Sequence, residues 1–401
     1  MKSKTINAKL FAALLLTSTA IGIALFPFWQ QARAVNITNI QPMPEQAPRI
    51  EVVFILDTTS SMSGLIQAAK DKIWSIATTM ASAQQNPDVK IGLVAFRDRG
   101  DAYVTRVYDL SEDFDSMYVN LMDFRAQGGG DGPESVNQAL FDAVNRISWS
   151  NDNGVYKVAF LVGDAPPHMD YANEVQYPET LKLAASKGII VNAIQSGQQQ
   201  STRPAWQQIA SLGNGEFFQV ENSGNAVAVA TPFDAKLSKL AAELENTRLY
   251  YGDKETKLSQ QRKLDANDRL RKELSEEALA RRATYNATSS GSKNFLGESE
   301  LVEAIASGKV DLDDIASDEL PASLQAMALA EQQAVIAEKA KRRDQLKAEI
   351  KKLSETRSLF IVDKINADGG AEDSLDEKIY SAVKDQAAAK GLSYESDNAS
   401  Y

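Results

Sequence analysis

The sequence predicts an α/β fold with a doubly wound, mainly parallel sheet, followed by an α-helical C-terminal region. Continuous apolar runs such as VVFIL and VAFLV are typical of strands that are covered on both faces. Apolar residues at helical spacing follow these runs, so strands and helices alternate along the first half of the chain. After about residue 231 the strand signals become rare and long charged stretches begin.

The predicted elements of the first half alternate from residue 50 to residue 220. In order, they are a strand at 52–56, a helix through 66–80, a strand at 89–96, a helix through 136–147 with Pro133 near its first turn, a strand at 158–162, a helix that Pro178 opens and Gly188 closes, a strand at 189–191, a helix at 206–212 and a strand at 217–220.

The second half is predicted to be helical. A first helix at 234–249 has an apolar stripe, and a break at 289–292 (SSGS) follows a charged stretch. A long helix is expected at 321–357, and only LFIV at 359–362 reads as a strand signal. The stripe of the first helix is Leu237, Leu240 and Leu244, and Leu346, Ile350 and Leu353 of the long helix have coiled-coil spacing.

The predicted domain organisation has four parts. They are a signal peptide at 1–34, a proline-containing linker at 35–49, an α/β domain at 50–250 and a helical region at 251–401 that ends in a disordered tail. We expect the chain from Thr231 onward to be separable from the sheet, except for the helix at 234–249. The C-terminal helices could self-associate, or they could pack against the α/β domain.

The N-terminus has the order of a secretory signal peptide. Three lysines precede an apolar stretch from Leu10 to Phe28, and the small-residue motif Ala32-Arg33-Ala34 follows. We expect cleavage after Ala34 and export to the periplasm or the extracellular space. The alternative is an uncleaved helix that anchors the chain, because the stretch is nearly long enough to span a bilayer.

The composition excludes several classes of site and partner. The 401 residues carry a formal net charge of −11, no cysteine and a single histidine, His168. The chain therefore has no disulfide, no thiolate site and no multi-histidine zinc site of its own. The negative charge argues against nucleic-acid binding, which needs a basic surface. We expect a soluble, acidic protein that attracts cations.

Three loops place oxygen-bearing side chains where ligands bind in such a sheet, beyond the carboxyl ends of the strands. They are ILDTTSSMSG after the first strand, AQGGGDGPES before the helix at 136–147, and LVGD after the strand at 158–162. Carboxylates and hydroxyls are hard ligands that suit Mg²⁺, Mn²⁺ or Ca²⁺. The candidate metal ligands are Asp57, Thr59, Ser61, Asp131 and Asp164.

At these residues the sequence resembles the von Willebrand factor A domain family. The likeness covers about Ile50 to Glu245 and rests on D-x-T-x-S after a first strand, GGGDxPE in a second loop and GDAPPH after a later strand. The resemblance implies a Rossmann-like fold with a metal-ion-dependent adhesion site at the candidate residues. It also implies a protein partner whose group completes the coordination of a divalent cation, with Mg²⁺ expected ahead of Mn²⁺ or Ca²⁺.

Asp131 departs from the family pattern, because that position usually holds a threonine. If Asp131 ligates directly, the site holds three negative charges against two positive ones. Such a site is expected to bind metal more tightly and to favour an acidic partner group less. Ligation through water is the alternative.

Other interpretations of these residues compete with metal binding. Asp57 and its neighbours could cap the following helix, or Asp57 could be a phosphotransferase aspartate, although Thr59 stands where that chemistry needs a second acid. His168 could act as a base or touch a partner, but a loop residue packed beside two prolines explains it. Turn chemistry explains the Arg-Gly-Asp tripeptide at 99–101, and the acidic stretch 311–319 lacks the glycine and spacing of a calcium loop.

The sequence thus predicts an exported, non-enzymatic module that binds another protein in a metal-dependent manner. The alternatives are a metal-assisted hydrolase or its regulatory subunit, and a structural helical protein with an inactive metal site. No set of serine, histidine and aspartate, no phosphate loop and no carboxylate pair with a clear role supports an enzyme.

Overall fold

The computed structural model describes residues 48–130, 132–220, 229–367 and 375–394, and these lie in one compact unit. The predicted signal peptide, most of the linker, Asp131 and the last seven residues fall outside the described residues. In the described part of the chain, no helix is long and apolar enough to cross a membrane.

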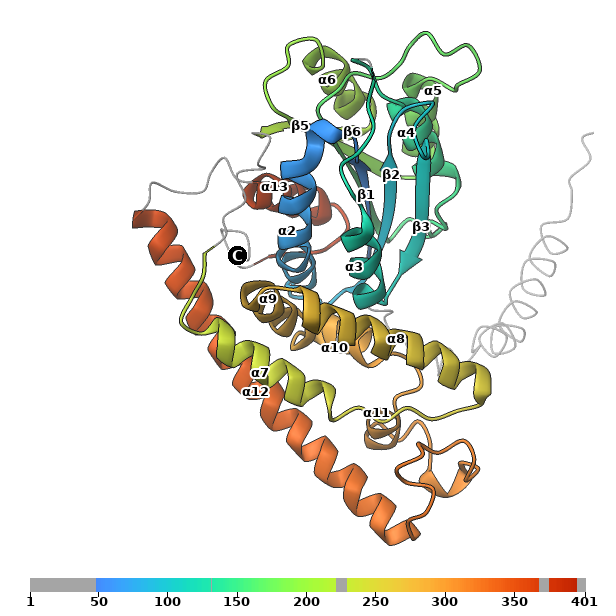
Figure 1. Cartoon of the computed structure of the whole chain (residues 1–401), viewed down its shortest axis with the longest axis vertical. Coiled ribbons are helices and arrows are strands. Elements are labelled where there is room, and N and C mark those ends of the chain that lie inside the picture. The colour runs from blue at the N-terminus through green and yellow to red at the C-terminus, as the bar shows by residue number, and fades with distance from the viewer. Residues whose placement is uncertain (1–47, 131, 221–228, 368–374, 395–401) are drawn as a thin grey trace, which may run out of the picture. The chain divides into compact units, whose positions relative to one another are not determined.

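A six-stranded sheet forms the centre of the fold, with strand order β3-β2-β1-β4-β5-β6 (Figure 1). The strands pair in parallel except for β2 and β3, which are antiparallel. Their bounds are β1 Arg49–Asp57, β2 Asp88–Phe96, β3 Thr105–Ser111, β4 Tyr156–Gly163, β5 Ile189–Ser196 and β6 Asn214–Val220. The strand order reverses between β1 and β4, because β2 and β3 lie on one side of β1 and β4, β5 and β6 lie on the other. Sheets of this kind bind ligands at such a switch point, beyond the carboxyl ends of the strands.

Helices cover both faces of the sheet, as the continuous apolar strands require. One face packs against α2 (Ser63–Ala81) and α3 (Phe114–Asp123). The opposite face packs against α4 (Val136–Asn145), α5 (Tyr177–Ser186) and α6 (Arg203–Leu212). The predicted doubly wound α/β fold is confirmed.

The sequence did not predict two elements of this half, β3 and α3. β3 is a half-exposed edge strand whose run TRVYDLS mixes charged and apolar residues, so it lacks the continuous apolar signal. Asp113 caps α3 by accepting a hydrogen bond from the Ser116 N–H at 3.2 Å. Pro133 lies ahead of α4, whose N-cap is Ser135, and does not form part of its first turn.

The second half is helical, as predicted, but its boundaries differ. Ser289–Ser292 is not a break: it forms the first turn of α10, which Thr288 caps. The long helix begins at Leu329 because turns follow Pro321, and it runs through residues 359–362, which are helical and not a strand. The bounds are α7 Asp234–Glu245, α8 Lys254–Glu273, α9 Glu276–Asn286, α10 Ser289–Leu296, α11 Leu301–Ala306, α12 Leu329–Ala367 and α13 Leu375–Ala388, with short 3-10 turns η1 Ser60–Met62 and η2 Leu312–Asp314.

The C-terminal helices share the core of the sheet domain. The Tyr285 ring on α9 stacks on Phe114 of α3 with ring centroids 4.8 Å apart, and it also contacts Trp74 of α2. Leu270, Ile379, Ala382, Val383 and Leu392 belong to the same buried cluster as one face of the sheet. The expectation that this region is separable from the sheet therefore does not fit the structure.

The coiled-coil stripe of the long helix is buried inside the chain. Leu346 and Ile350 of α12 pack with Leu237 and Leu244 of α7 and with apolar residues of α9 and α10. The predicted apolar stripe of α12 is therefore present. It packs against the α7 stripe of the same chain.

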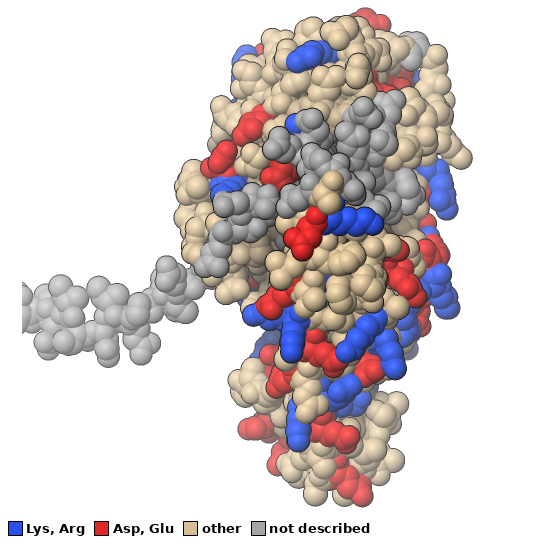
Figure 2. All heavy atoms as spheres, turned by 90° about the vertical axis from the view of Figure 1, so that its left-hand side faces the viewer, with Lys and Arg blue, Asp and Glu red and all other residues tan. Residues whose placement is uncertain are grey.

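The described end of the chain is also packed. The Gln84 N–H donates to the Ser393 carbonyl at 3.0 Å, and the Tyr394 ring meets Tyr380 edge to face. The predicted fraying thus does not begin before Tyr394. Seen from the side on which α12 lies, basic and acidic side chains are interspersed over the lower half of the molecule (Figure 2). This mixed pattern agrees with the interpretation of the charged helices as solvated faces.

Candidate metal centre

Two of the predicted ligands come from the ends of neighbouring strands. Asp57 is the last residue of β1, and Asp164 directly follows β4. β1 and β4 pair in parallel with Leu56 opposite Val162, so both carboxylates emerge at the same edge of the sheet. Asp57 is buried, and Asp164 is half-buried.

Hydrogen bonds join four of the predicted side chains into one cluster. Thr59 donates to Asp57 Oδ1 from its N–H at 2.9 Å and from its hydroxyl at 2.6 Å. The Thr59 and Ser61 hydroxyl oxygens lie 3.3 Å apart, and Ser61 hydrogen-bonds to the Asp164 carboxylate. The structure therefore brings Asp57, Thr59, Ser61 and Asp164 together, as predicted.

Asp57 does not cap the helix that follows it, α2, as one interpretation of the sequence proposed. Asp57 closes a local turn with Thr59, and the N-cap of α2 is Met62, which makes no side-chain capping bond. The carboxylate is thus held by the loop rather than by the end of α2.

The second oxygen of Asp57 is the strongest sign of a bound group. Asp57 Oδ2 is buried and has no hydrogen-bond partner among the described residues. A buried carboxylate oxygen without a partner costs free energy, so such an atom calls for an explanation. Gly163 leaves room for it, because a Cβ at Gly163 would lie 3.0 Å from the Asp57 Cβ and 3.1 Å from Asp57 Oδ2.

The glycine-rich loop is fastened beside this cluster. Gly128 accepts a 2.8 Å hydrogen bond from the Ser60 hydroxyl, and the Gly129 N–H donates to Asp101 Oδ2 at 3.1 Å. Gly129 has a φ of +84°, and a Cβ there would lie 3.5 Å from the Thr59 Cβ and 3.4 Å from a Glu134 oxygen. Asp131 itself lies outside the described residues, so its predicted ligand role stays a prediction.

Glu134 is a member of the site that sequence reasoning did not select. It is buried, its Oε2 has no hydrogen-bond partner among the described residues, and it lies in the GGGDGPES loop. The available signal was an acidic residue directly after Pro133 in a loop already assigned to this edge. The Glu134 N–H donates to the Pro166 carbonyl at 2.9 Å, which joins this loop to the one that follows Asp164.

The electrostatics of the cluster favour protons or a cation. Burial raises the pKa of Asp57 to about 7 against the hydrogen bonds from Thr59, and the Asp164 charge adds to the rise. Burial, together with the charges of Asp57 and Asp98, raises the pKa of Glu134 to about 9. The pKa of Asp164 is raised by burial too. A divalent cation would relieve the same repulsion that the protons relieve.

These shifts predict a pH dependence of the metal-free chain. A raised carboxyl pKa stabilises the folded state below the unfolded pKa, and that stability is lost as pH rises through the folded pKa. In EDTA, the free energy of unfolding is therefore expected to fall from about pH 5 to about pH 9, the window set by Asp57 and Glu134. Urea unfolding at several pH values measures this. Asp57→Asn should flatten the fall around pH 7, and an unchanged profile would contradict the assignment.

The oxygen atoms of the cluster fit a hard divalent cation, although carboxylates alone do not form a complete set of ligands. Among the described residues, no group of three or more histidine, aspartate or glutamate side chains is arranged to hold a metal ion. The cluster instead offers two carboxylates with hydroxyl oxygens, which suit Mg²⁺ or Mn²⁺ when water or another group completes the coordination. The orphaned Asp57 Oδ2 and the space beside Gly163 agree with this chemistry.

His168 is a packed loop residue, as one interpretation of the sequence held. It is buried, its ring stacks on Tyr171 with centroids 4.0 Å apart, and its Nδ1 lies 2.8 Å from Asp170 Oδ1. Its Nε2 lies 3.4 Å from Asp98 Oδ2. The sequence analysis did not predict that Asp98 and Asp170 would lie beside His168.

The Arg-Gly-Asp tripeptide is used within the chain. Arg99 pairs with Glu174 at 2.9 Å and lies over the Tyr171 ring. Asp101 accepts from the N–H groups of Asp98 and Gly129. Both charged side chains thus serve the loops of this edge, which agrees with the turn interpretation.

Comparisons with known proteins match the first half of the chain. The family model of the von Willebrand factor A domain matches residues 51–224. A solved mussel byssus protein, proximal thread matrix protein 1 with a zinc-occupied MIDAS motif, is 17% identical, with a TM-score of 0.34 over 43% of this chain and 42% of its own. The SpRpn10 VWA domain is 14% identical, with a TM-score of 0.34 over 46% of this chain and 100% of its own.

A curated relative matches the same half of the chain. A putative ariadne-like RING finger protein of Acanthamoeba polyphaga mimivirus is 21% identical over 212 residues, which are 49% of this chain. The matched region spans about a fifth of the relative's own length (21%). The family match, the strand order and the D-x-T-x-S cluster together identify residues 51–224 of this chain as a von Willebrand factor A domain.

Proposed function

We propose that this chain binds another protein through a divalent cation held at the carboxyl edge of its sheet. Von Willebrand factor A domains are protein-interaction modules that often depend on a metal, and they are typically non-catalytic. The observation that carries the proposal is Asp57 Oδ2, a buried carboxylate oxygen without a partner among the described residues. Thr59 donates to the other oxygen of Asp57, and further hydrogen bonds link Thr59 to Ser61 and Ser61 to Asp164.

The roles of the residues follow from their positions. Asp57, Thr59, Ser61 and Asp164 would hold the cation, with Asp131 completing the set from the glycine-rich loop, and the cation would supply an open coordination position for a partner's oxygen. Glu134 would accept a hydrogen bond from a water or hydroxyl beside the site, because its Oε2 has no other partner among the described residues. Mg²⁺ is the favoured ion, since the donors are all hard oxygens.

The proposal includes export of the chain and a binding role outside the cytoplasm. Its support is the sequence of the N-terminal segment alone, with three lysines, an apolar stretch and Ala32-Arg33-Ala34. The partner would then be a protein of the same compartment or of the cell surface.

Asp164→Ala is expected to abolish the rise in melting temperature that Mg²⁺ or Mn²⁺ gives the wild-type chain. Asp164 lies at the rim of the core, so the circular dichroism of the variant should remain close to that of the wild type. Asp344→Ala on the exposed face of α12 removes the same charge far from the site and should keep the full metal response. A full metal response in Asp164→Ala would refute its role as a ligand.

The same variant tests the function. The wild-type chain, immobilised on a column, should retain a partner from the exported fraction with Mg²⁺ and release it in EDTA. Asp164→Ala should retain none of it under either condition, while Asp344→Ala should behave as the wild type does. If the column retains the partner equally well in EDTA and with Asp164→Ala, the partner does not bind through the cation. That result would refute the proposal.

A further inference from the structure

Two arginine side chains lie around one tyrosine ring beside the metal loop. Arg97 directly follows β2 and is 4% exposed, whereas Arg106 on the neighbouring strand β3 is exposed. Both guanidinium groups lie over the Tyr103 ring, at 4.5 and 4.2 Å from its centroid. Two like charges therefore share one aromatic ring. We call Arg97, Tyr103 and Arg106 the arginine cluster.

The guanidinium of Arg97 is only partly used inside the chain. Its Nε donates to the Thr58 hydroxyl at 3.3 Å, and its Nη2 donates to the Arg125 carbonyl at 2.7 Å. Its Nη1 makes no hydrogen bond with a described residue, and in the described part of the chain neither Arg97 nor Arg106 forms an ion pair. Arginine is rarely buried without a carboxylate, so the open donor beside a second guanidinium favours an anion.

The acidic side chains of the neighbouring loops are bound to other groups. Asp101 accepts from the N–H groups of Asp98 and Gly129. Asp123 at the end of α3 pairs with Arg269 at 2.5 Å. The arginine cluster is therefore a local excess of positive charge in a chain whose net charge is −11, and such an excess attracts acidic groups.

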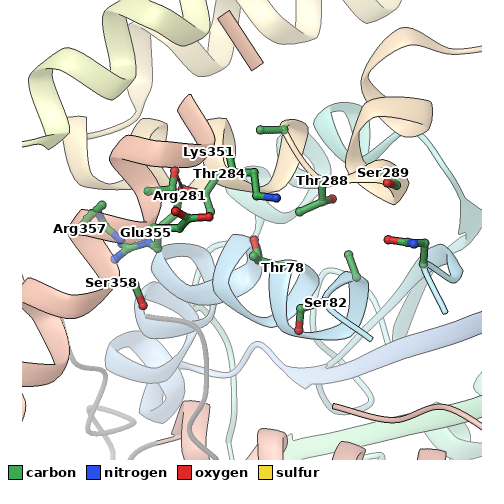
Figure 3. A pocket seen from close by; sticks show the side chains of 14 residues that line it. Thr78, Ser82, Arg281, Thr284, Thr288, Ser289, Lys351, Glu355, Arg357 and Ser358 are labelled. Carbon is green, nitrogen blue, oxygen red and sulfur yellow. Dashed lines mark hydrogen bonds between the residues drawn. The ribbon is translucent and has the colours of Figure 1, made fainter. Parts of the chain in front are cut away.

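Two basic side chains in the lining of the cavity between α2, α9, α10 and α12 differ, because they have acidic neighbours (Figure 3). Arg357 pairs with Asp234 at 2.7 Å. Lys351 lies four positions before Glu355 on α12, and residues at this spacing are neighbours on a helix. The arginine cluster is thus the stronger candidate for an acidic ligand.

The arginine cluster borders the metal loop. Thr58 lies within that loop, between two of the candidate ligands, and its hydroxyl oxygen accepts from Arg97 Nε and lies 2.7 Å from the Tyr103 hydroxyl. Arg97 directly follows β2, which pairs in parallel with β1, the strand that ends at Asp57. Neighbouring strands are about 5 Å apart. One partner surface is therefore wide enough to reach both the metal edge and Arg106.

We propose that the arginine cluster binds an acidic side chain of the same protein partner that reaches the cation. This inference rests on the proposed metal-dependent binding. A glutamate or aspartate of the partner would accept hydrogen bonds from Arg97 Nη1 and Arg106, because a guanidinium matches a carboxylate in shape and charge. A neutral oxygen of the partner would then complete the coordination. This division agrees with the expectation that Asp131 makes the metal site less favourable to an acidic group.

Fluorescence anisotropy of labelled peptides with the full chain in Mg²⁺ tests the inference. The probes are a short peptide of alternating glutamate and serine and its counterpart with glutamine in place of glutamate. We expect the glutamate peptide to bind roughly tenfold more tightly, which is the usual scale of hydrogen bonds to a charged group. Equal affinity for the two peptides, or no binding of the glutamate peptide, would overturn the inference.

Matched variants separate the arginine cluster from the metal. Arg106→Glu should remove the preference for the glutamate peptide and should keep the rise in melting temperature with Mg²⁺. Arg262→Glu makes the same charge change on an exposed residue of α8, outside the cluster, and should keep the preference. Equal losses in the two variants would mean long-range electrostatics without a site. An unchanged preference in Arg106→Glu would show that the cation alone attracts the peptide.

The metal response distinguishes failure of this inference from failure of the proposed function. If Mg²⁺ leaves the melting temperature of the wild-type chain unchanged, the metal-dependent function falls, and the shared partner falls with it. If the wild-type chain responds to Mg²⁺ but Arg106→Glu binds both peptides as the wild type does, only the role of the arginine cluster is refuted.

Discussion

A fragment that ends after Tyr251 is expected to lose cooperative folding, although it contains all six strands of the sheet and α7. The residues beyond it cover one face of the sheet domain. Five large side chains of the buried cluster would be removed, and they are Leu270, Tyr285, Ile379, Val383 and Leu392. Trp74 and Phe114 would lose the Tyr285 ring that packs on both.

The free energy contributed by these buried side chains is comparable to the whole stability of a domain. Burying a large apolar side chain contributes roughly 1.5–3 kcal/mol, so five such side chains represent roughly 10 kcal/mol. The whole stability of a domain is about 5–15 kcal/mol. Polar contacts are lost as well, such as the hydrogen bonds of Gln386 with Tyr156 at 2.9 Å and with Asn192 at 2.7 Å.

Urea unfolding followed by tryptophan fluorescence and by size-exclusion chromatography measures the outcome. The control is a chain that ends after Tyr394, which keeps every described contact and should unfold as the full chain does. A monomeric 251-residue fragment with a sharp unfolding transition and an intact metal response would show that the sheet domain is independent after all.

The sheet was predictable because its signals are local. Runs such as VVFIL and VAFLV are too apolar and too short for anything but a covered strand in this context, and helices with one apolar face separate them. The edge strand β3 could not be found in this way, because it is half exposed and its apolar and polar residues do not alternate regularly. The LFIV run at 359–362 shows the converse error, since a short apolar run inside a 39-residue helix resembles a strand.

The docking of the helical region could not be read from local patterns. The apolar residues of α8 and α9 are sparse within strongly charged sequence, and Leu270 and Tyr285 are single positions rather than stripes. Their burial depends on which surfaces meet in three dimensions. The α12 seam was visible, but whether its partner was another chain or the α7 stripe was not.

The site was partly predictable for the same reason. Asp57, Thr59 and Ser61 alternate directly after a strand, so their convergence with Asp164 follows from strand pairing. Glu134 became part of the site through backbone contacts between two loops, which no spacing in the sequence expresses.

A buried ionic cluster joins the helical region to the sheet domain. Arg282 of α9 donates to both oxygens of Asp115 on α3, at 2.6 and 2.7 Å, and it pairs with Glu245 at the end of α7. It also donates to the Asn267 side chain on α8 at 2.9 Å. Its side chain is 1% exposed, and the side chains of Asp115 and Glu245 are 4% and 6% exposed. One guanidinium thus holds three other helices.

The charges in this cluster depend on one another. Burial disfavours the ionised form of Arg282, but the Asp115 and Glu245 carboxylates outweigh this and raise the pKa of the guanidinium. Burial also opposes ionisation of Asp115, and Arg282 reverses the effect, so the pKa of that carboxyl is lowered. Removing the arginine alone would leave Asp115 without its ion-pair partner and would leave Glu245 with Arg271, whose Nη1 lies 3.6 Å from Glu245 Oε2.

Arg282→Met is therefore expected to lower the free energy of unfolding by about 3–5 kcal/mol at pH 7, the usual cost of breaking a buried pair. Arg269→Ala is the matched control, because Arg269 on α8 pairs with Asp123 at the surface, and such exposed pairs contribute about 1 kcal/mol or less. Urea unfolding measures both variants. The triple variant Arg282→Met, Asp115→Asn, Glu245→Gln should recover part of the loss, because the destabilisation comes mainly from the buried acids that lose the Arg282 charge. If Arg282→Met costs no more than Arg269→Ala, the cluster does not hold the helical region to the sheet, and the apolar contacts of Tyr285 and α13 must do so alone.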